Sequence, residues 1–129
     1  MSTAYDTVTD YIEDARTLLL DTVAPYRYDD PSLLVALNAA LLEGRRLRPD
    51  LFVYATKDGS APSFDTNADQ PVPIEEQFRL AFVHGLVGHA LARDQEDVQD
   101  GRATAFLKMF SDILIGVSTM GPSTPQGAS

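Results

Sequence analysis

The chain has 129 residues, enough for one domain with a real hydrophobic core, and its 44% hydrophobic and 22% charged residues are typical of a globular protein. It contains no cysteine, which excludes disulfides, thiolate metal sites and cysteine nucleophiles. Nineteen acidic and ten basic residues give a formal charge of −9, which disfavours sequence-independent binding to nucleic acid, although a halophilic source would produce the same charge.

Neither a signal peptide nor a membrane span is predicted from the sequence. Residues 1–6 lack a basic region followed by an apolar stretch, so we expect no signal peptide. No later segment approaches the roughly 18 to 20 apolar residues that a membrane span needs.

A first helix is predicted near the N-terminus. Apolar residues recur at three- and four-residue steps on one helix face: Val8, Tyr11, Ile12, Ala15, Leu18 and Leu19. Thr3 and Asp6 resemble a capping box, and Ala24-Pro25 is expected to end the helix, because the residue before a proline avoids the α region.

A second helix is predicted from Asp30 to Leu47. Asp30 as the N-cap and Pro31 at the first helical position indicate its start. Its apolar positions are Leu33, Leu34, Leu37, Leu41 and Leu47. Arginines near its end suit the negative end of the helix dipole, and Pro49 closes it.

Two polar features of this second helix predict contacts with other segments. Arg45, Arg46 and Arg48 form a basic cluster that acidic residues flank on both sides. We therefore expect ion pairs of Arg45 or Arg48, within the chain or across a subunit boundary, rather than phosphate binding. Asn38 lies near the apolar face, so we expect its side chain to form a hydrogen bond with a backbone group or a neighbouring helix.

Residues 50–73 differ in character from the helices. Leu51–Ala55 is short, apolar and partly β-favouring, and Asp58-Gly59 is a turn signal. Two short strands around this turn would form a hairpin arm. An irregular excursion fits equally well, because prolines break the second flank, Gln70–Pro73. We expect no core helix in this segment.

A third helix is predicted from Ile74 to Arg93. It is apolar on nearly every side, which indicates a central position in a bundle or an assembly. Gly85 and Gly88 each cost roughly 1 kcal/mol of helix propensity relative to Ala. We therefore expect a neighbouring helix to approach closely at these two glycines.

A fourth helix and a tail complete the chain. Asp94 is expected to cap this helix, whose inner face would comprise Val98, Phe106, Met109, Phe110, Ile113 and Val117. The fold class is thus mainly α: a four-helix bundle over residues 1–117, with an extended arm or β-hairpin at about 50–73. Residues 118–129 have no periodicity and almost no charge, so we expect a flexible tail.

No pattern in the sequence predicts catalysis, a cofactor or a metal site. His84 and His89 are five residues apart and would not share a helix face, so we expect each to be a hydrogen-bonded or surface imidazole. The acidic run that starts at Asp94 lacks the glycine and the glutamate of an EF-hand loop, and it is typical of a helix start. Carboxylate pairs elsewhere also lie at helix starts. We expect a protein that is not an enzyme.

The junctions between the predicted helices resemble those of a known family. The first half contains Leu18–Thr22, Tyr26–Asp30, Leu33–Ala40 and Glu43–Asp50, and the second contains Pro73, Phe78-Arg79, Ala90–Asp97, Arg102-Ala103 and Phe106–Phe110. A helix that ends in a leucine–aspartate pair leads to an arginine and an acidic cap. A leucine–asparagine helix follows and ends in arginine–proline–aspartate. Over roughly residues 8–115 this pattern resembles the head-to-tail adaptor, or connector, proteins of tailed bacteriophages.

The resemblance implies a structural virion protein, assembled in the host cytoplasm, whose copies form a ring, usually of twelve, that connects the portal to the tail. Its partners would be the portal protein, neighbouring copies of itself and a tail or nozzle protein. DNA would pass through the acidic ring without sequence-specific contact, and no membrane would be involved.

The resemblance also assigns roles to the two segments outside the helices. The arm would touch a neighbouring subunit or the next tail component, with Phe52, Tyr54 and Phe64 as candidate contacts. The tail would dock in the portal, and its candidate contacts are Gly116, Ser118, Met120, Pro122, Pro125, Gln126 and Ser129. Two alternatives stay open: a non-viral helical protein–protein interaction module, and a small enzyme that uses Asp and His at a subunit interface.

Overall fold

A computed structural model describes residues 5–53, 59–65, 70–94 and 101–116 of the chain. These residues form four α-helices and one short 3-10 helix: α1 Val8–Leu19, α2 Asp30–Leu47, η1 Pro49–Phe52, α3 Glu76–Arg93 and α4 Arg102–Ile115. The described residues contain no β-strand, and Thr7 and Pro71 form an isolated antiparallel bridge. The fold is therefore mainly helical, as the periodicity predicts. None of the described helices is long and apolar enough to span a bilayer.

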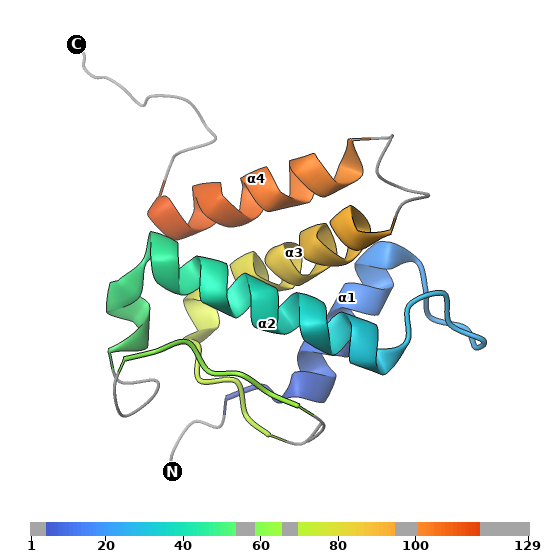
Figure 1. Cartoon of the computed structure of the whole chain (residues 1–129), viewed down its shortest axis with the longest axis horizontal. Helices are drawn as coiled ribbons and strands as arrows, with labels where there is room; N and C mark the ends of the chain where they lie inside the picture. The colour runs from blue at the N-terminus through green and yellow to red at the C-terminus, as the bar shows by residue number, and fades with distance from the viewer. Residues whose placement is uncertain (1–4, 54–58, 66–69, 95–100, 117–129) are drawn as a thin grey trace.

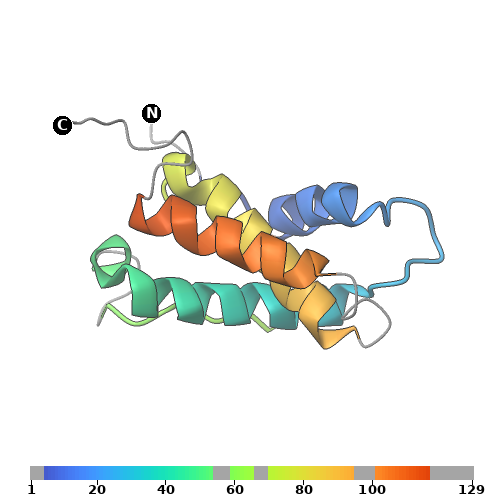
Figure 2. The same cartoon turned by 90° about the horizontal axis from the view of Figure 1, so that it is seen from above.

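Helix α3 lies at the centre of the helical bundle. Each of the other three α-helices packs against it, and Figures 1 and 2 show α1, α2 and α4 arranged around it. Nearly all of its side chains from Ala81 to Leu91 are buried. The prediction that this helix occupies a central position is confirmed.

Two glycines of α3 let α4 approach closely. A Cβ on Gly85 would lie 3.0 Å from the ring of Phe110, and a Cβ on Gly88 would lie 2.7 Å from the side chain of Leu107. A Cβ at 2.7 Å is closer than real Cβ atoms approach, and one at 3.0 Å is unusually tight, so a larger residue at either position would require α4 or its side chains to shift. The predicted close approach at both positions is confirmed.

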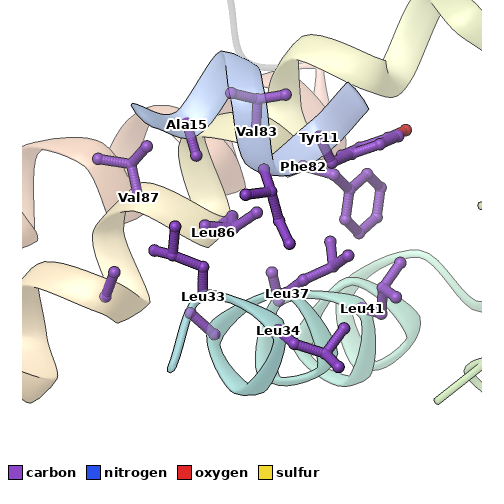
Figure 3. Packing of buried hydrophobic residues seen from close by; sticks show 14 of the residues in the cluster. Tyr11, Ala15, Leu33, Leu34, Leu37, Leu41, Phe82, Val83, Leu86 and Val87 are labelled. Carbon is purple, nitrogen blue, oxygen red and sulfur yellow. The ribbon is translucent and has the colours of Figure 1, made fainter. Parts of the chain in front are cut away.

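The core combines an aromatic cluster with rows of leucines. Phe82 of α3 packs edge-on against Phe52, at 6.1 Å between ring centroids, and against Phe110 at 5.3 Å. Gly44 of α2 meets the same ring, since a Cβ there would lie only 2.4 Å from Phe82. Figure 3 shows Leu33, Leu37 and Leu41 on the side of α2 that faces labelled side chains of α1 and α3. The apolar faces predicted for the first two helices are the buried ones.

The ends of α1 differ from the prediction. Its capping box is Thr7 with Asp10, because the Thr7 hydroxyl accepts from the Asp10 amide and the Asp10 carboxylate accepts from the Thr7 amide. Thr3 lies outside the described residues. The helix ends at Leu19, before the predicted Ala24-Pro25 boundary. Leu20 turns left-handed at φ +58°, and the next amide donates to a carbonyl of the last helical turn, which closes the helix.

The starts of α2 and α3 are shifted by one or two residues from those predicted. Asp29, not Asp30, caps α2 and accepts a 2.8 Å hydrogen bond from the Ser32 amide, because the carboxylate of Asp30 is held by Arg16. Helix α3 begins at Glu76 rather than Ile74. Ile74 is buried in the preceding non-helical segment, so the chain enters the core before the helix begins.

Helix α4 departs further from the prediction. Its N-cap is Gly101, whereas Asp94 ends α3, so the prediction that Asp94 caps the fourth helix is wrong. Met109 is 47% exposed, and Leu114, which the prediction omitted, is fully buried. The buried stripe runs through Ala103, Phe110 and Leu114, with Phe106 and Ile113 partly buried beside it. Val98 and Val117 lie outside the described residues.

The described parts of residues 50–73 pack on the bundle (Figure 1). Phe52 and Phe64 are buried in the chain's own core, so in this conformation neither side chain is available to a neighbouring subunit. The backbone around Pro71 pairs with the segment just before α1, through bonds from the Val8 amide to Gln70 and from the Val72 amide to Asp6. In the described residues this segment therefore forms no hairpin of its own, and Tyr54 lies outside them.

Candidate functional site

The loop between α1 and α2 closes over a buried ion pair. Arg16 and Asp21 are 6% and 8% exposed, and Nη1 of Arg16 lies 3.0 Å from Oδ2 of Asp21. Arg16 also donates to the carbonyl of Tyr28 at 2.8 Å and pairs with Asp30. The Asp21 oxygens accept from the amides of Arg27 and Tyr28, at 2.8 and 2.9 Å. A buried charge is stable only when an opposite charge and hydrogen bonds compensate for the loss of water. The Arg16–Asp21 pair and its hydrogen bonds to the backbone therefore fix the path of the loop.

The same loop is tied to the end of α3. Nε and Nη2 of Arg27 lie 2.8 and 2.7 Å from Oδ2 of Asp94, and the Tyr28 hydroxyl donates to the same oxygen at 2.7 Å. Tyr26 lies over the guanidinium of Arg16, 3.8 Å from its carbon to the ring centroid, in a cation–π contact. We call six residues of the loop and of the helices that flank it the α1–α2 junction: Arg16, Asp21, Tyr26, Arg27, Tyr28 and Asp30.

A second polar junction lies at the opposite end of α2. Arg48 forms a bidentate pair with Asp50, at 2.8 and 2.7 Å, and its Nη1 donates to the carbonyl of Leu114 in the last turn of α4. The hydrogen bond between the two side chains raises the pKa of Arg48 and lowers that of Asp50. The predicted ion pair of an arginine in this cluster is thus confirmed for Arg48, within the chain.

The other two arginines of the cluster make weaker contacts. Arg45 donates to the carbonyl of Gly59 at 2.6 Å rather than to a carboxylate. The guanidinium of Arg46 lies 3.7 Å from Glu43, and its side chain is 72% exposed. An exposed pair at this distance contributes about 0 to 1 kcal/mol, so Arg46 is available to other partners.

The side-chain amide of Asn38 forms two hydrogen bonds with the backbone of Phe64. Its amide nitrogen donates to the carbonyl of Phe64 at 2.7 Å, and its carbonyl oxygen accepts from the Phe64 amide at 2.9 Å. The prediction of a hydrogen bond from this side chain to backbone is confirmed. The contact attaches residues 59–65 to α2.

Arg79 connects α3 to α1, which sequence reasoning missed. It pairs with both Asp6 and Asp14 and lies 5.2 Å from the centroid of the Tyr11 ring. Burial alone would lower the pKa of Arg79, but the two carboxylates outweigh burial and raise it. Burial raises the pKa of the Tyr11 hydroxyl. No local motif marks this cluster, because Arg79 lies far along the chain from its three partners in residues 6–14.

The two histidines have different surroundings. His89 lies 2.8 Å from the carboxylate of Glu43, so the prediction of a hydrogen-bonded imidazole is confirmed there. His84 is buried against the ring of Phe106, and its Nδ1 has no hydrogen-bond partner among the described residues. The same prediction is therefore wrong for His84. Burial lowers the pKa of this imidazole.

The predicted portal-docking residues are almost all beyond the described part of the chain. Gly116 is exposed and ends α4 in a left-handed conformation, at φ +76°. Ser118, Met120, Pro122, Pro125, Gln126 and Ser129 lie outside the described residues. Among the described residues, no group of three or more His, Asp or Glu side chains could hold a metal ion.

No protein-family model, curated protein or solved structure matches the chain.

Proposed function

We propose that this chain is a structural virion protein whose copies form a ring that connects the portal of a tailed bacteriophage to its tail and lets DNA pass. The residues that carry the resemblance to head-to-tail adaptors support the proposal. Arg27, Asn38 and Arg48 each make a contact that joins segments far apart in the sequence, and Asp21 holds the loop between α1 and α2. The shared pattern thus consists of the contacts that hold the helices and loops in one arrangement.

The observation on which the proposal chiefly depends is the contact between Arg48 and Leu114. It joins the residue just before the 50–73 segment to the last turn before the tail. The two segments to which the resemblance assigns outside partners therefore start from one end of the bundle. A connector that engages its partners through an arm and a tail needs such a common rigid base. The net charge of −9 also suits a ring wall that DNA must pass without binding.

Co-expression with the portal protein encoded in the same genome tests the proposal. Size-exclusion chromatography with light scattering, followed by negative-stain electron microscopy, should detect a ring of several copies seated on the portal. A stable monomer or dimer that does not bind the portal would refute the adaptor role and favour the interaction module. A genome without portal and tail genes would do the same.

Removal of residues 118–129 tests the docking role of the tail. The shortened chain should keep its melting temperature and lose attachment to the portal, because all of the described helices end before the deleted part. A chain with the same twelve residues in scrambled order is the matched control and should also fail to attach. Unchanged attachment of the shortened chain would remove the docking role.

A further inference from the structure

A cavity of about 320 Å³ opens between α1 and the start of α2, beside the α1–α2 junction. Its walls include three buried apolar side chains: Val8, Ile12 and Leu34. Its lining also carries three carboxylates: Glu13, Asp30 and Asp65. We call this cavity, with its lining residues, the acidic groove.

The charges around the acidic groove favour a cationic occupant. Arg16 also lines it, but Arg16 is buried and its single positive charge is shared between Asp30 and the buried Asp21. The carboxylates of the groove therefore leave it with a net negative field. The apolar floor fits an aliphatic side chain. The carboxylates around it fit a guanidinium beside that side chain, because arginine forms strong hydrogen bonds with carboxylates.

The chain carries a matching surface near the other end of α2. Leu42 is 65% exposed, and Arg45 and Arg46 follow it at three and four residues, so all three share one helix face. We call Leu42, Arg45 and Arg46 the α2 basic face. Its exposed leucine supplies the apolar side chain, and Arg46, which is held only weakly by Glu43, supplies the cation. Residues 117–129 contain no basic side chain, so the tail does not match the groove in this way.

The two surfaces are displaced along α2 and cannot meet within one copy. Asp30 and Leu42 are twelve residues apart on this helix, which is about 18 Å at 1.5 Å per residue. Figure 1 shows the start of α2 beside α1 and its other end across the molecule. A contact between two different patches of one chain is heterologous, and repeated heterologous contacts close into rings when the rotation permits.

We propose that the α2 basic face of one copy docks in the acidic groove of the next copy. Leu42 then packs on the apolar floor, and Arg46 pairs with the exposed carboxylate of Glu13 at the rim. The inference rests on the proposed ring and names the surfaces through which its subunits meet.

Charge reversal tests this contact. Glu13→Arg and Arg46→Glu change exposed residues on opposite sides of the proposed interface, so both variants should keep the wild-type melting temperature. On the portal, each variant alone should bind without completing the ring, because like charges then face each other. An equimolar mixture of the two variants should restore the ring, since alternating copies make every interface complementary. Rings from either variant alone, or no restoration on mixing, would overturn the proposal.

A crosslinking experiment separates this inference from the proposed function, because it needs no portal. The chain has no native cysteine, so Thr9→Cys in the groove and Arg45→Cys on the basic face, which keeps both Leu42 and Arg46, can be joined by a bismaleimide without background. Mixed at high concentration, these variants should crosslink at least about tenfold more than Arg45→Cys mixed with Thr17→Cys, an exposed position two turns further along α1. Equal yields would refute the contact even if a ring forms on the portal. A specific crosslink without any portal-bound ring would refute the proposed function alone.

Discussion

Replacement of Asp21 by Asn isolates the buried charge at the α1–α2 junction without a change in side-chain shape. In the native chain one carboxylate oxygen accepts from the Arg27 amide, and the other accepts from Arg16 and the Tyr28 amide. An asparagine offers one acceptor oxygen and one NH2 group, so at least one of these donors faces another donor. Arg16 also loses the buried carboxylate that matches its charge.

The expected cost is large for a single isosteric change. A buried donor left without an acceptor costs about 1 to 3 kcal/mol, and removal of one partner of a buried ion pair costs about 3 to 5 kcal/mol. Arg16 keeps its contact with Asp30, so we expect a loss of about 3 kcal/mol. In a domain of this size that corresponds to a melting temperature lower by roughly 12 °C.

Thermal and urea unfolding, followed by circular dichroism, measure this loss. Asp30→Asn is the matched control, because Asp30 contacts the same arginine but its side chain is 75% exposed. We expect the control to lose no more than about 1 kcal/mol, since exposed pairs contribute little. Equal losses in the two variants, or a loss below about 1 kcal/mol in Asp21→Asn, would refute the view that this pair holds the loop.

Three further changes probe the core. Leu37→Ala removes a fully buried side chain and should cost about 2 to 5 kcal/mol in the same unfolding measurements; a loss near zero would mean that this face of α2 is not buried. Gly44→Ala should destabilise the fold by about 2 kcal/mol, although alanine has the better helix propensity. The added methyl group would lie 2.4 Å from the Phe82 ring, which is itself packed between Phe52 and Phe110. A gain in stability would show that the ring can move. Burial holds the pKa of His84 in the folded chain below its ordinary value of about 6.5. As the pH falls, this imidazole is therefore protonated in the unfolded chain before it is protonated in the folded chain. The free energy of unfolding should fall as the pH drops from about 7.5 to 5.5. His84→Leu should reduce this fall, and melting curves with the same pH dependence in both chains would contradict it.

Much of the helical architecture follows from local pattern. The apolar periods of α1 and α2 identify their buried faces, because a helix repeats every 3.6 residues whatever packs against it. The arginines and Pro49 mark the end of α2 in the same local way. The apolar surround of α3 and its glycines indicate a central helix that a neighbour approaches closely. The predicted start of α2 is wrong by only one residue, because two adjacent aspartates, Asp29 and Asp30, could each serve as its N-cap.

Tertiary packing decided the features that local pattern leaves open. Both Met109 and Leu114 are apolar, and only the position of α3 determines which of them is buried. Gly44 looks like an ordinary helix residue until the ring of Phe82 packs against it. The partner of Asn38 was expected in kind but not in identity, because Phe64 lies 26 residues away.

The candidate surfaces show the same division. Sequence alone identifies the arginine cluster near the end of α2 and the excess of acidic over basic residues in the whole chain. The acidic groove forms only when folding brings together Glu13 of α1, Asp30 of α2 and Asp65 of the segment between η1 and α3. Periodicity and capping act between residues a few positions apart, so a sequence displays them directly. Ion pairs and grooves depend on distances through space between remote segments, and the packed core sets those distances.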